Sequence, residues 1–193
     1  MWSKILPDIA LVEPDLSYAD RILDYRSACL GEPFGVHGAA RLDLYEDVEA
    51  WLAHVASLAH PTEETGVVPS SQFLAVRSSD GRLVGTVNIR YALNDFWLNF
   101  GGHIGYMVRP DERRKGYAAC ITQLALDKLR AQGVKRALIT CVDTNEASRR
   151  TILKAGGIYE DTRTREDGSR MERYWIEVPP NWEEERRTNG TNQ

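Results

Sequence analysis

Hydrophobic and polar residues alternate along several short stretches of the chain, and a period of two residues is typical of β-strands. The strands that this pattern predicts are residues 9–12, 73–76, 83–91, 103–109, 136–142, 158–165 and 171–178. Residues 83–91 alternate most regularly, with a half-polar face that carries Thr86, Asn88 and Arg90. That face either borders a wet cleft or simply meets solvent, which is the commoner arrangement for an antiparallel sheet.

Apolar residues recur at helical spacing in four other stretches, which predicts four amphipathic helices. These stretches are residues 19–30, 46–60, 117–132 and 146–155. The predicted order of elements is therefore β-α-α-β-β-β-α-β-α-β-β. Within it, the strand–helix–strand unit of residues 102–142 is expected to be parallel and right-handed.

Residues 103–118 form a strand, then a basic loop, then the start of a helix. Pro110 ends the strand, five charged residues follow, and Gly116 precedes the helical pattern. The first N–H groups of a helix lack intrahelical partners and carry partial positive charge, so a phosphate can bind there. Gly116 has no Cβ and lets a ligand approach the backbone. The spacing alone does not separate a pyrophosphate-binding turn from a solvated basic loop.

The composition narrows the class of protein. The 193 residues carry a net charge of −4, from 24 basic and 28 acidic residues, which argues against a general nucleic-acid binder. No apolar run reaches the length of a membrane span, and the first residues do not resemble a signal peptide. The three cysteines show no metal-binding spacing, so we expect free thiols in the cytoplasm. We expect one domain over residues 1–182 and a polar, disordered tail over residues 183–193.

The identities of the loop residues carry a family resemblance. Val108-Arg109-Pro110 followed by Arg113-x-x-Gly116-x-Ala118 resembles the acetyl-CoA-binding signature of the GNAT superfamily of acyltransferases. The resemblance extends over residues 9–178. Neither a P-loop nor a Rossmann glycine pattern is present. The resemblance implies a mixed α/β fold, with a central, mostly antiparallel, twisted sheet of about seven strands, a parallel strand–helix–strand cofactor unit and four flanking helices.

The same resemblance implies which residues bind acetyl-CoA. The pantetheine arm is expected along the backbone of Tyr106, Met107 and Val108, with the N–H of Val108 facing the thioester oxygen. The pyrophosphate is expected on Arg113, Arg114, Lys115, Gly116, Tyr117 and Ala118. Asn145 stands where the family places an asparagine that contacts the cofactor, and Ser148 lies in the same helical turn. A plain helix N-cap is the alternative role for Asn145, and both roles are compatible.

Two positions concern the transfer chemistry. His103 is the candidate general base, because its ordinary pKa suits proton acceptance at neutral pH and the family often places a carboxylate there. A structural histidine at the start of the strand is the alternative. Ile152 occupies the position where many family members carry a tyrosine as general acid. The sequence therefore assigns no acid.

These patterns predict an N-acetyltransferase that moves an acetyl group from acetyl-CoA to a primary amine directly, in a ternary complex. A small-molecule acceptor is expected, without nucleic acid, membrane or metal, and a homodimer is left open. One alternative is a GNAT-fold sensor that binds acyl-CoA without turnover. The other is an acyltransferase for a longer acyl donor or a protein acceptor. The sequence does not identify the acceptor.

Overall fold

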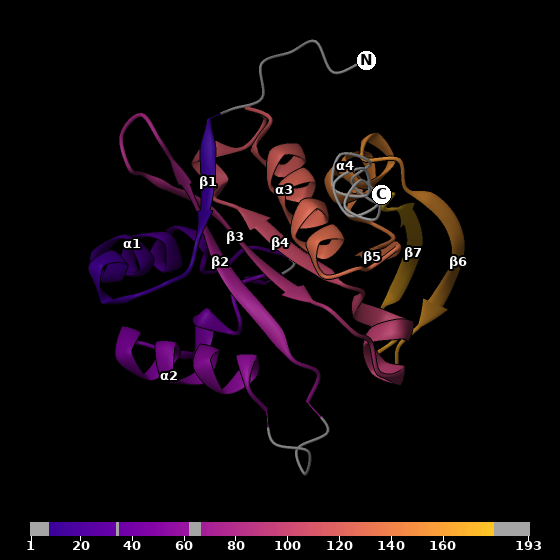
Figure 1. Ribbon diagram of the computed structural model, residues 1–193, viewed down its shortest axis with the longest axis horizontal. Coiled ribbons are helices and arrows are strands. Elements are labelled where there is room, and N and C mark those ends of the chain that lie inside the picture. The colour runs from indigo at the N-terminus through magenta and orange to yellow at the C-terminus, as the bar shows by residue number, and fades with distance from the viewer. Residues whose placement is uncertain (1–7, 34, 62–66, 180–193) are drawn as a thin grey trace, which may run out of the picture.

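The computed structural model describes residues 8–33, 35–61 and 67–179, and within them the predicted order of elements is confirmed (Figure 1). The elements are β1 (Ile9–Val12), α1 (Ala19–Cys29), α2 (Val48–Ala59), β2 (Ser70–Arg77), β3 (Leu83–Arg90), β4 (Ile104–Val108), α3 (Tyr117–Ala131), β5 (Arg136–Val142), α4 (Glu146–Lys154), β6 (Ile158–Thr164) and β7 (Arg170–Glu177). A π-helical turn, η4 (Trp97–Gly101), precedes β4. The predicted tail of residues 183–193 lies outside the described residues.

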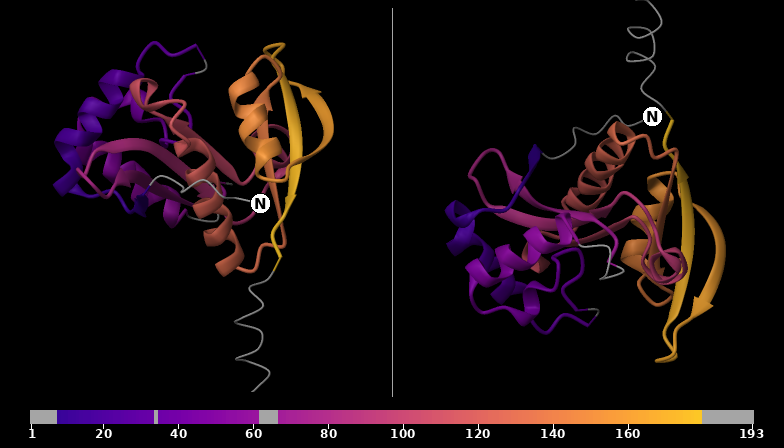
Figure 2. Two further views of the ribbon diagram at one scale, coloured as in Figure 1. Left: turned by 90° about the horizontal axis from the view of Figure 1, so that it is seen from above. Right: turned by 60° about the horizontal axis from the view of Figure 1, so that its bottom comes forward.

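The strands form two sheets rather than one continuous sheet. The first has the order β1-β2-β3-β4 and the second the order β5-β7-β6, with antiparallel pairing throughout. The two sheets meet between β4 and β5, where the described residues form only an isolated bridge from Gly102 to Ile139. In two further views the sheets diverge from this junction (Figure 2). The expected seven strands are therefore present, but the sheet is split at the cofactor unit.

Helices cover both faces of the first sheet. Helix α3 packs on one face with β3 and β4, while α1 and α2 pack on the other (Figure 1). Helix α4 packs beside α3 and against β5. Because β3 lies between two helical layers, its residues Leu83 to Ile89 are all buried. The alternation of residue types along β3 thus reflects two buried environments, one on each face of the sheet, rather than one buried face and one face in solvent.

The half-polar face of β3 is covered, so the commoner of the two arrangements weighed above is not found. Thr86 is fully buried beneath α1, and its Oγ1 lies 3.1 Å from Tyr25 Oη. Asn88 Nδ2 donates to Ser70 Oγ at 3.2 Å and lies at the edge of a cavity together with Arg90. Neutral hydrogen bonds satisfy the inner part of this face, and its outer end faces that cavity.

The helices and thiols of the described residues bear on two further expectations. Across residues 8–33, 35–61 and 67–179, no helix combines the length and the apolar character that a bilayer crossing requires. Cys29, Cys120 and Cys141 are all buried and form no disulfide. Burial is the main reason that the pKa of each of these thiols is raised.

Candidate active site

One edge of β4 is left without a partner strand. The N–H of Arg90 bonds to the carbonyl of His103, and the N–H of Arg109 bonds to the carbonyl of Val84. Odd-numbered residues of β4 therefore direct their peptide groups to β3, and even-numbered residues direct theirs toward β5. Since no ladder joins β4 to β5, the peptide groups of Tyr106 and Val108 face the gap between the sheets. Those of Met107 face β3, and its side chain packs in the core beneath α1 and α2.

His103 holds the two sheets together at the start of this gap. Its backbone N–H donates to the carbonyl of Leu138 at 2.7 Å, and its Nδ1 accepts from the N–H of Leu138 at 2.9 Å. The ring is buried, meets Trp175 edge-on and is not among the residues that line the nearby cavity. These contacts agree with the structural alternative considered above. The role of His103 as a base stays a prediction without geometric support.

The contacts of His103 predict a pH-dependent contribution to stability. Burial lowers its pKa to about 4 from an ordinary value near 6.5, and the charge of Arg90 acts in the same direction. As the pH falls from about 6.5 to 4, the unfolded chain gains a proton that the folded chain excludes. The free energy of unfolding should therefore fall by on the order of 3 kcal/mol over this window. Urea unfolding of His103→Asn should show a correspondingly weaker pH dependence.

The exposed His60 provides the matched control for this experiment. His60→Asn should retain the pH dependence of the wild type between pH 6.5 and 4. If His103→Asn and the wild type lose stability equally over this window, His103 is not the buried neutral group described here.

The loop after β4 leaves the start of α3 open to a ligand. Gly116 is the N-cap of α3, with φ of +92°, and it has no side chain that could cap the helix. By contrast, Asp47 caps α2 and Asn145 caps α4 with side-chain oxygens. Residues 113–116 are exposed. An anion can therefore reach the first N–H groups of α3, which the helix itself does not use.

The cations predicted to bind pyrophosphate are partly engaged by carboxylates. Arg113 pairs with Glu32 at 2.6 Å, and Lys115 pairs with the buried Glu112 at 2.8 Å. The side chains of Arg113 and Lys115 remain 44% and 52% exposed, so both cations are open to solvent although Glu112 is buried. Such pairs can rearrange toward a phosphate. Tyr117 is instead part of the core, and its hydroxyl accepts a hydrogen bond from Arg77 at 3.0 Å.

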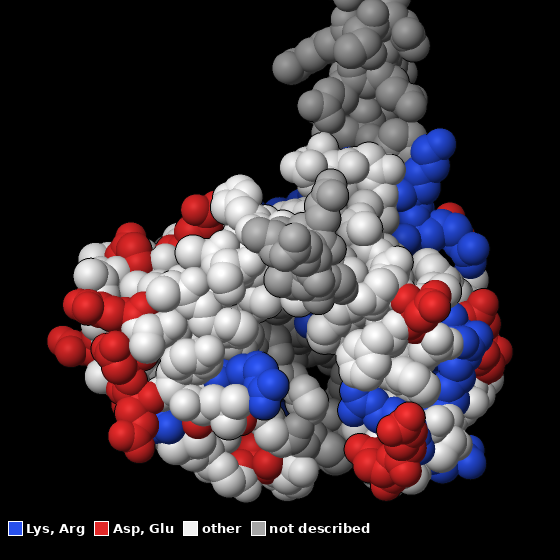
Figure 3. All heavy atoms as spheres, turned by 90° about the horizontal axis from the view of Figure 1, so that it is seen from below, with Lys and Arg blue, Asp and Glu red and all other residues white. Residues whose placement is uncertain are grey.

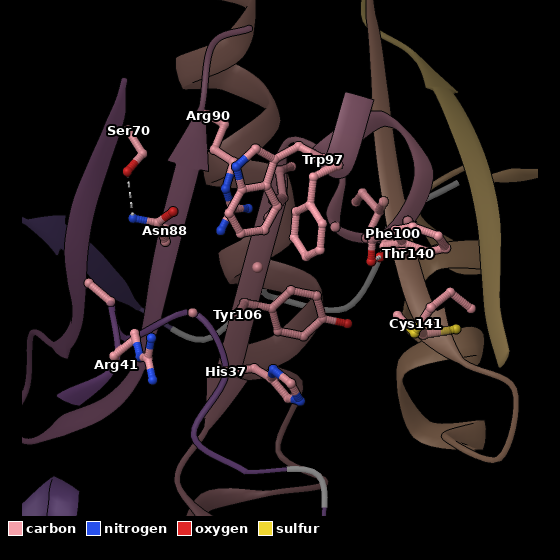
Figure 4. A pocket seen from close by; sticks show the side chains of 18 of the residues that line it. His37, Arg41, Ser70, Asn88, Arg90, Trp97, Phe100, Tyr106, Thr140 and Cys141 are labelled. Carbon is pink, nitrogen blue, oxygen red and sulfur yellow. Dashed lines mark hydrogen bonds between the residues drawn. The ribbon is translucent and has the colours of Figure 1, made fainter. Parts of the chain in front are cut away.

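A cavity of about 450 Å³ lies between the two sheets, beside the open edge of β4. Loop 36–41, α2, β3, η4, β5 and the start of α4 contribute to its walls, together with Arg165 of the β6–β7 connection. Arg41, Arg90 and Trp97 are among the lining side chains that Figure 4 labels. From below, the surface is hollowed between the two halves, and basic side chains lie at the margins of the hollow (Figure 3). The volume suits a small organic molecule.

Tyr106 projects from β4 toward β5 into this region (Figure 4). Its hydroxyl oxygen is buried and has no hydrogen-bond partner among the described residues. Burial raises the pKa of Tyr106, while nearby Ser148 and Thr151 oppose that rise. Ile152, which replaces the family's tyrosine, is fully buried in the core. The sequence pattern thus identified a missing hydroxyl on α4 but overlooked one on β4.

Asn145 and Ser148 lie together at the start of α4. Asn145 Oδ1 accepts from the N–H of Ser148 at 3.1 Å, which is the N-cap role considered above. Both residues also line the cavity. The cofactor contact remains compatible with the cap.

The structure adds cavity residues that the sequence did not identify. His37 and Arg41 come from the loop between α1 and α2, and Trp97 and Phe100 come from η4. A loop without periodicity gives no sign of which side chains face a cavity. Asn88 and Arg90 carried a usable signal, since both lie on the half-polar face of a strand otherwise rich in apolar residues.

Comparisons with known proteins agree with this geometry. The chain matches the family model of the acetyltransferase (GNAT) domain over residues 40–158. No curated protein sequence matches the chain. Among solved structures, the microcin C7 self-immunity acetyltransferase MccE, crystallised with acetyl-CoA and AMP, gives a TM-score of 0.65 at 16% identity, covering 89% of this chain and 93% of MccE.

Two further solved structures share the fold. The spermidine/spermine N-acetyltransferase SpeG of Vibrio cholerae gives a TM-score of 0.63 at 13% identity, covering 89% of this chain and 94% of SpeG. The yncA protein of Salmonella typhimurium, solved with its cofactor acetyl-CoA, gives 0.59 at 15% identity, covering 90% of this chain and 96% of yncA. At these low identities the solved structures show only a shared fold, whereas the family model matches more than half of the chain. The expected fold and enzyme class are confirmed: the chain belongs to the GNAT family of acetyltransferases, which use acetyl-CoA as the acetyl donor.

Proposed function

We propose that this protein transfers an acetyl group from acetyl-CoA directly to the primary amine of a small-molecule acceptor. The observation that carries the proposal is the arrangement around β4. Its free edge and the cavity lie at the gap between the sheets, and the loop that follows it leads to the uncapped start of α3. This arrangement offers one site for phosphates and another for a thioester and an amine.

The free edge of β4 gives the cofactor a route between these sites. The pyrophosphate binds the N–H groups that begin α3, with Arg113, Arg114 and Lys115 around it. The amide groups of the pantetheine arm then hydrogen-bond to the peptide groups of Tyr106 and Val108, as a partner strand would. Asn145 and Ser148 face the arm from the other side of the gap. The thioester thereby reaches the cavity.

In the transfer step, the neutral amine attacks the thioester carbon. A C–N bond forms, the attacking nitrogen loses its surplus proton to water, the C–S bond breaks, and the thiolate of CoA leaves. The N–H of Val108 faces the oxygen on which negative charge develops, and such donors commonly contribute most of the stabilisation. The ammonium must lose its proton before attack, either to water or to a side chain of the cavity. His103 remains the candidate from the sequence.

A covalent enzyme intermediate is disfavoured by the state of Cys141. This thiol lines the cavity, so its position alone would permit it to accept an acetyl group. Burial and the neighbouring Glu172 raise its pKa to about 12. Only a minute fraction is therefore thiolate at neutral pH, and the thiolate is the nucleophilic form. Direct transfer in a ternary complex is the simpler path.

Tyr106 is the proposed proton donor to the departing thiolate. Tyr106 lines the cavity, its hydroxyl has no hydrogen-bond partner among the described residues, and a raised pKa keeps it protonated at neutral pH. During transfer the O–H proton moves toward the sulfur, and solvent restores it afterwards. An unpaired buried hydroxyl costs free energy in the unliganded protein, and the developing thiolate can accept its hydrogen bond as the C–S bond breaks.

Tyr106→Phe should lower kcat by about 100-fold, near the lower end of the range typical for acid–base groups, because a thiolate leaves readily. The affinity for acetyl-CoA should change little, since the backbone contacts remain. The melting temperature should stay level or rise, because the mutation removes an unsatisfied buried hydroxyl. Steady-state kinetics, calorimetry and thermal unfolding of one preparation give all three values.

Tyr174→Phe is the matched control, since the Tyr174 hydroxyl donates to Glu172 at 2.7 Å within the second sheet. That variant should lose stability and keep its kcat. An unchanged kcat in Tyr106→Phe would remove the proposed donor role and leave the thiolate to depart unassisted.

The experiment that tests the proposed function measures release of CoA thiol from acetyl-CoA, with and without a panel of primary amines. Acetyl transfer predicts release that depends on an amine, together with an N-acetylated product seen by mass spectrometry. Tight binding of acetyl-CoA by calorimetry without release for any amine would instead favour the acyl-CoA sensor.

A further inference from the structure

We infer that the acceptor is a small amine that also carries an anionic oxyacid group, a carboxylate or a phosphate, next to an apolar or aromatic part. This inference rests on the proposed function and assigns the substrate class of the same cavity. It follows from the charges, rings and contacts of the cavity walls that lie away from the start of α3.

The described residues that line the cavity include cations but no carboxylates. Arg41, Arg90 and Arg165 line it, and none of the described lining residues is an aspartate or a glutamate. A wall of this kind raises the local concentration of anions and opposes cations. A polyamine such as the substrate named for SpeG would meet like charge from the described walls of the cavity.

These three arginines differ from most others in the described part of the chain. Elsewhere arginines are commonly paired, as Arg149 is with Glu172 and Arg173 with Asp161. None of the three forms an ion pair with a described carboxylate. Their charges are therefore available to a ligand.

Arg90 is the central residue of this set. Its guanidinium carbon lies 3.4 Å from the ring centroid of Trp97, and Nη1 donates to the carbonyl of Gly102 at 3.2 Å (Figure 4). Burial lowers its pKa to about 10, so it stays charged at neutral pH. A ring and a carbonyl fix its orientation but do not neutralise it. A partly desolvated guanidinium held in this way favours an oxyanion that accepts two hydrogen bonds.

The other walls of the cavity indicate which chemical group the acceptor carries next to its anion. Phe96, Trp97 and Phe100 form an aromatic side, and Arg165 lies over Phe96 and Phe100 at 5.5 and 5.8 Å. Leu58 of α2 faces the same space. An apolar or aromatic side chain buries its surface against these rings, and the anion meets Arg90. An amino acid or an aminoalkyl phosphate has this combination of groups.

The test compares matched acceptors that differ in one charge. L-phenylalanine is paired with L-phenylalaninamide, and O-phosphoethanolamine with ethanolamine, while spermidine serves as the cation. In the CoA-release assay we expect the anionic member of at least one pair to have the higher kcat/KM, and spermidine the lowest. The preferred pair identifies the anion as carboxylate or phosphate.

Arg90→Gln should lower kcat/KM for the preferred anionic acceptor by about 10- to 100-fold and change that of its neutral partner little, the loss expected for a charged hydrogen bond. Arg163→Gln is the matched control, since Arg163 pairs with Asp161 and does not line the cavity. It should leave both values unchanged.

A binding measurement separates the two possible failures. Calorimetry in the presence of CoA compares N-acetyl-L-phenylalanine with its amide, and N-acetyl-O-phosphoethanolamine with N-acetylethanolamine. If no anionic member is preferred, or if Arg90→Gln leaves the preference intact, the inference is overturned even when acetyl-CoA binds and other amines react. Failure of acetyl-CoA itself to bind would overturn the proposed function instead.

Discussion

Gly116→Asp should abolish detectable binding of acetyl-CoA. The substitution places a carboxylate at the start of α3, where we propose that two phosphates bind. It also gives a side chain to a residue with φ of +92°. Loss of two charge-assisted hydrogen bonds alone corresponds to about 100- to 1,000-fold in affinity. Isothermal calorimetry of the folded variant, checked by circular dichroism, measures the effect.

Gly133→Asp is the matched control for this variant. Gly133 follows the other end of α3 and also has a positive φ, at +76°. Apart from Gly133 and its two chain neighbours, no atom of the described residues lies within 4 Å of the position that a Cβ added to Gly133 would take. This variant carries the same backbone strain and the same added charge. It should therefore lose at least as much stability, because a carboxylate opposes the dipole at this end of the helix, and keep its affinity for acetyl-CoA. Equal affinities in both variants would refute the phosphate site at Gly116.

Gly38→Ala should cause the largest loss of stability and should also damage the cavity. Gly38 lies against β4, and an added Cβ would come within 2.3 Å of Gly105 O and 2.5 Å of Tyr106 Cα. Both contacts are with backbone, which cannot rotate away. We expect about 2–5 kcal/mol from overpacking together with a residue at φ of +65°. The loop also carries His37 and Arg41, so the folded fraction should lose activity.

Gly35→Ala separates overpacking from backbone strain as the two causes of the stability loss expected for Gly38→Ala. Gly35 belongs to the same loop and has φ of +73°, but no atom lies within 4 Å of its added Cβ. It should cost only the backbone term of about 1–2 kcal/mol and keep its activity. Chemical unfolding and the CoA-release assay compare the two variants. Equal costs would show that the loop does not rest on β4 as described.

Much of the fold could be predicted because local signals and the global arrangement agree. β5 was predicted over residues 136–142 and found there, since a β-rich run ends at Asp143 and a helix follows. The split between β4 and β5 is not visible in the residues themselves, because it depends on the absence of pairing between distant segments. Only the resemblance to the GNAT family implies a splay between these two strands. Alternation along β3 likewise showed two faces but not that helices cover both of them.

The candidate site also has a part that the sequence could indicate and a part that it could not. The loop from Arg113 to Ala118 could be proposed as a phosphate site from the sequence, because such a site consists of consecutive residues at the end of one strand. The cavity depends on residues that come together only in the fold, such as Arg41, Arg90 and Trp97. His103 shows that a residue type can suggest a role for which the fold gives no support. Its residue type suggested a base, whereas its position places both its Nδ1 and its backbone N–H on Leu138.

A crystal structure of the protein with CoA bound tests the central claim most directly. We expect the pyrophosphate on the N–H groups of residues 114–118. We also expect the pantetheine arm along Tyr106 to Val108, with the thiol in the gap near the Tyr106 hydroxyl and β5. Phosphates bound elsewhere on the surface, with the gap between β4 and β5 unchanged and empty, would contradict that claim.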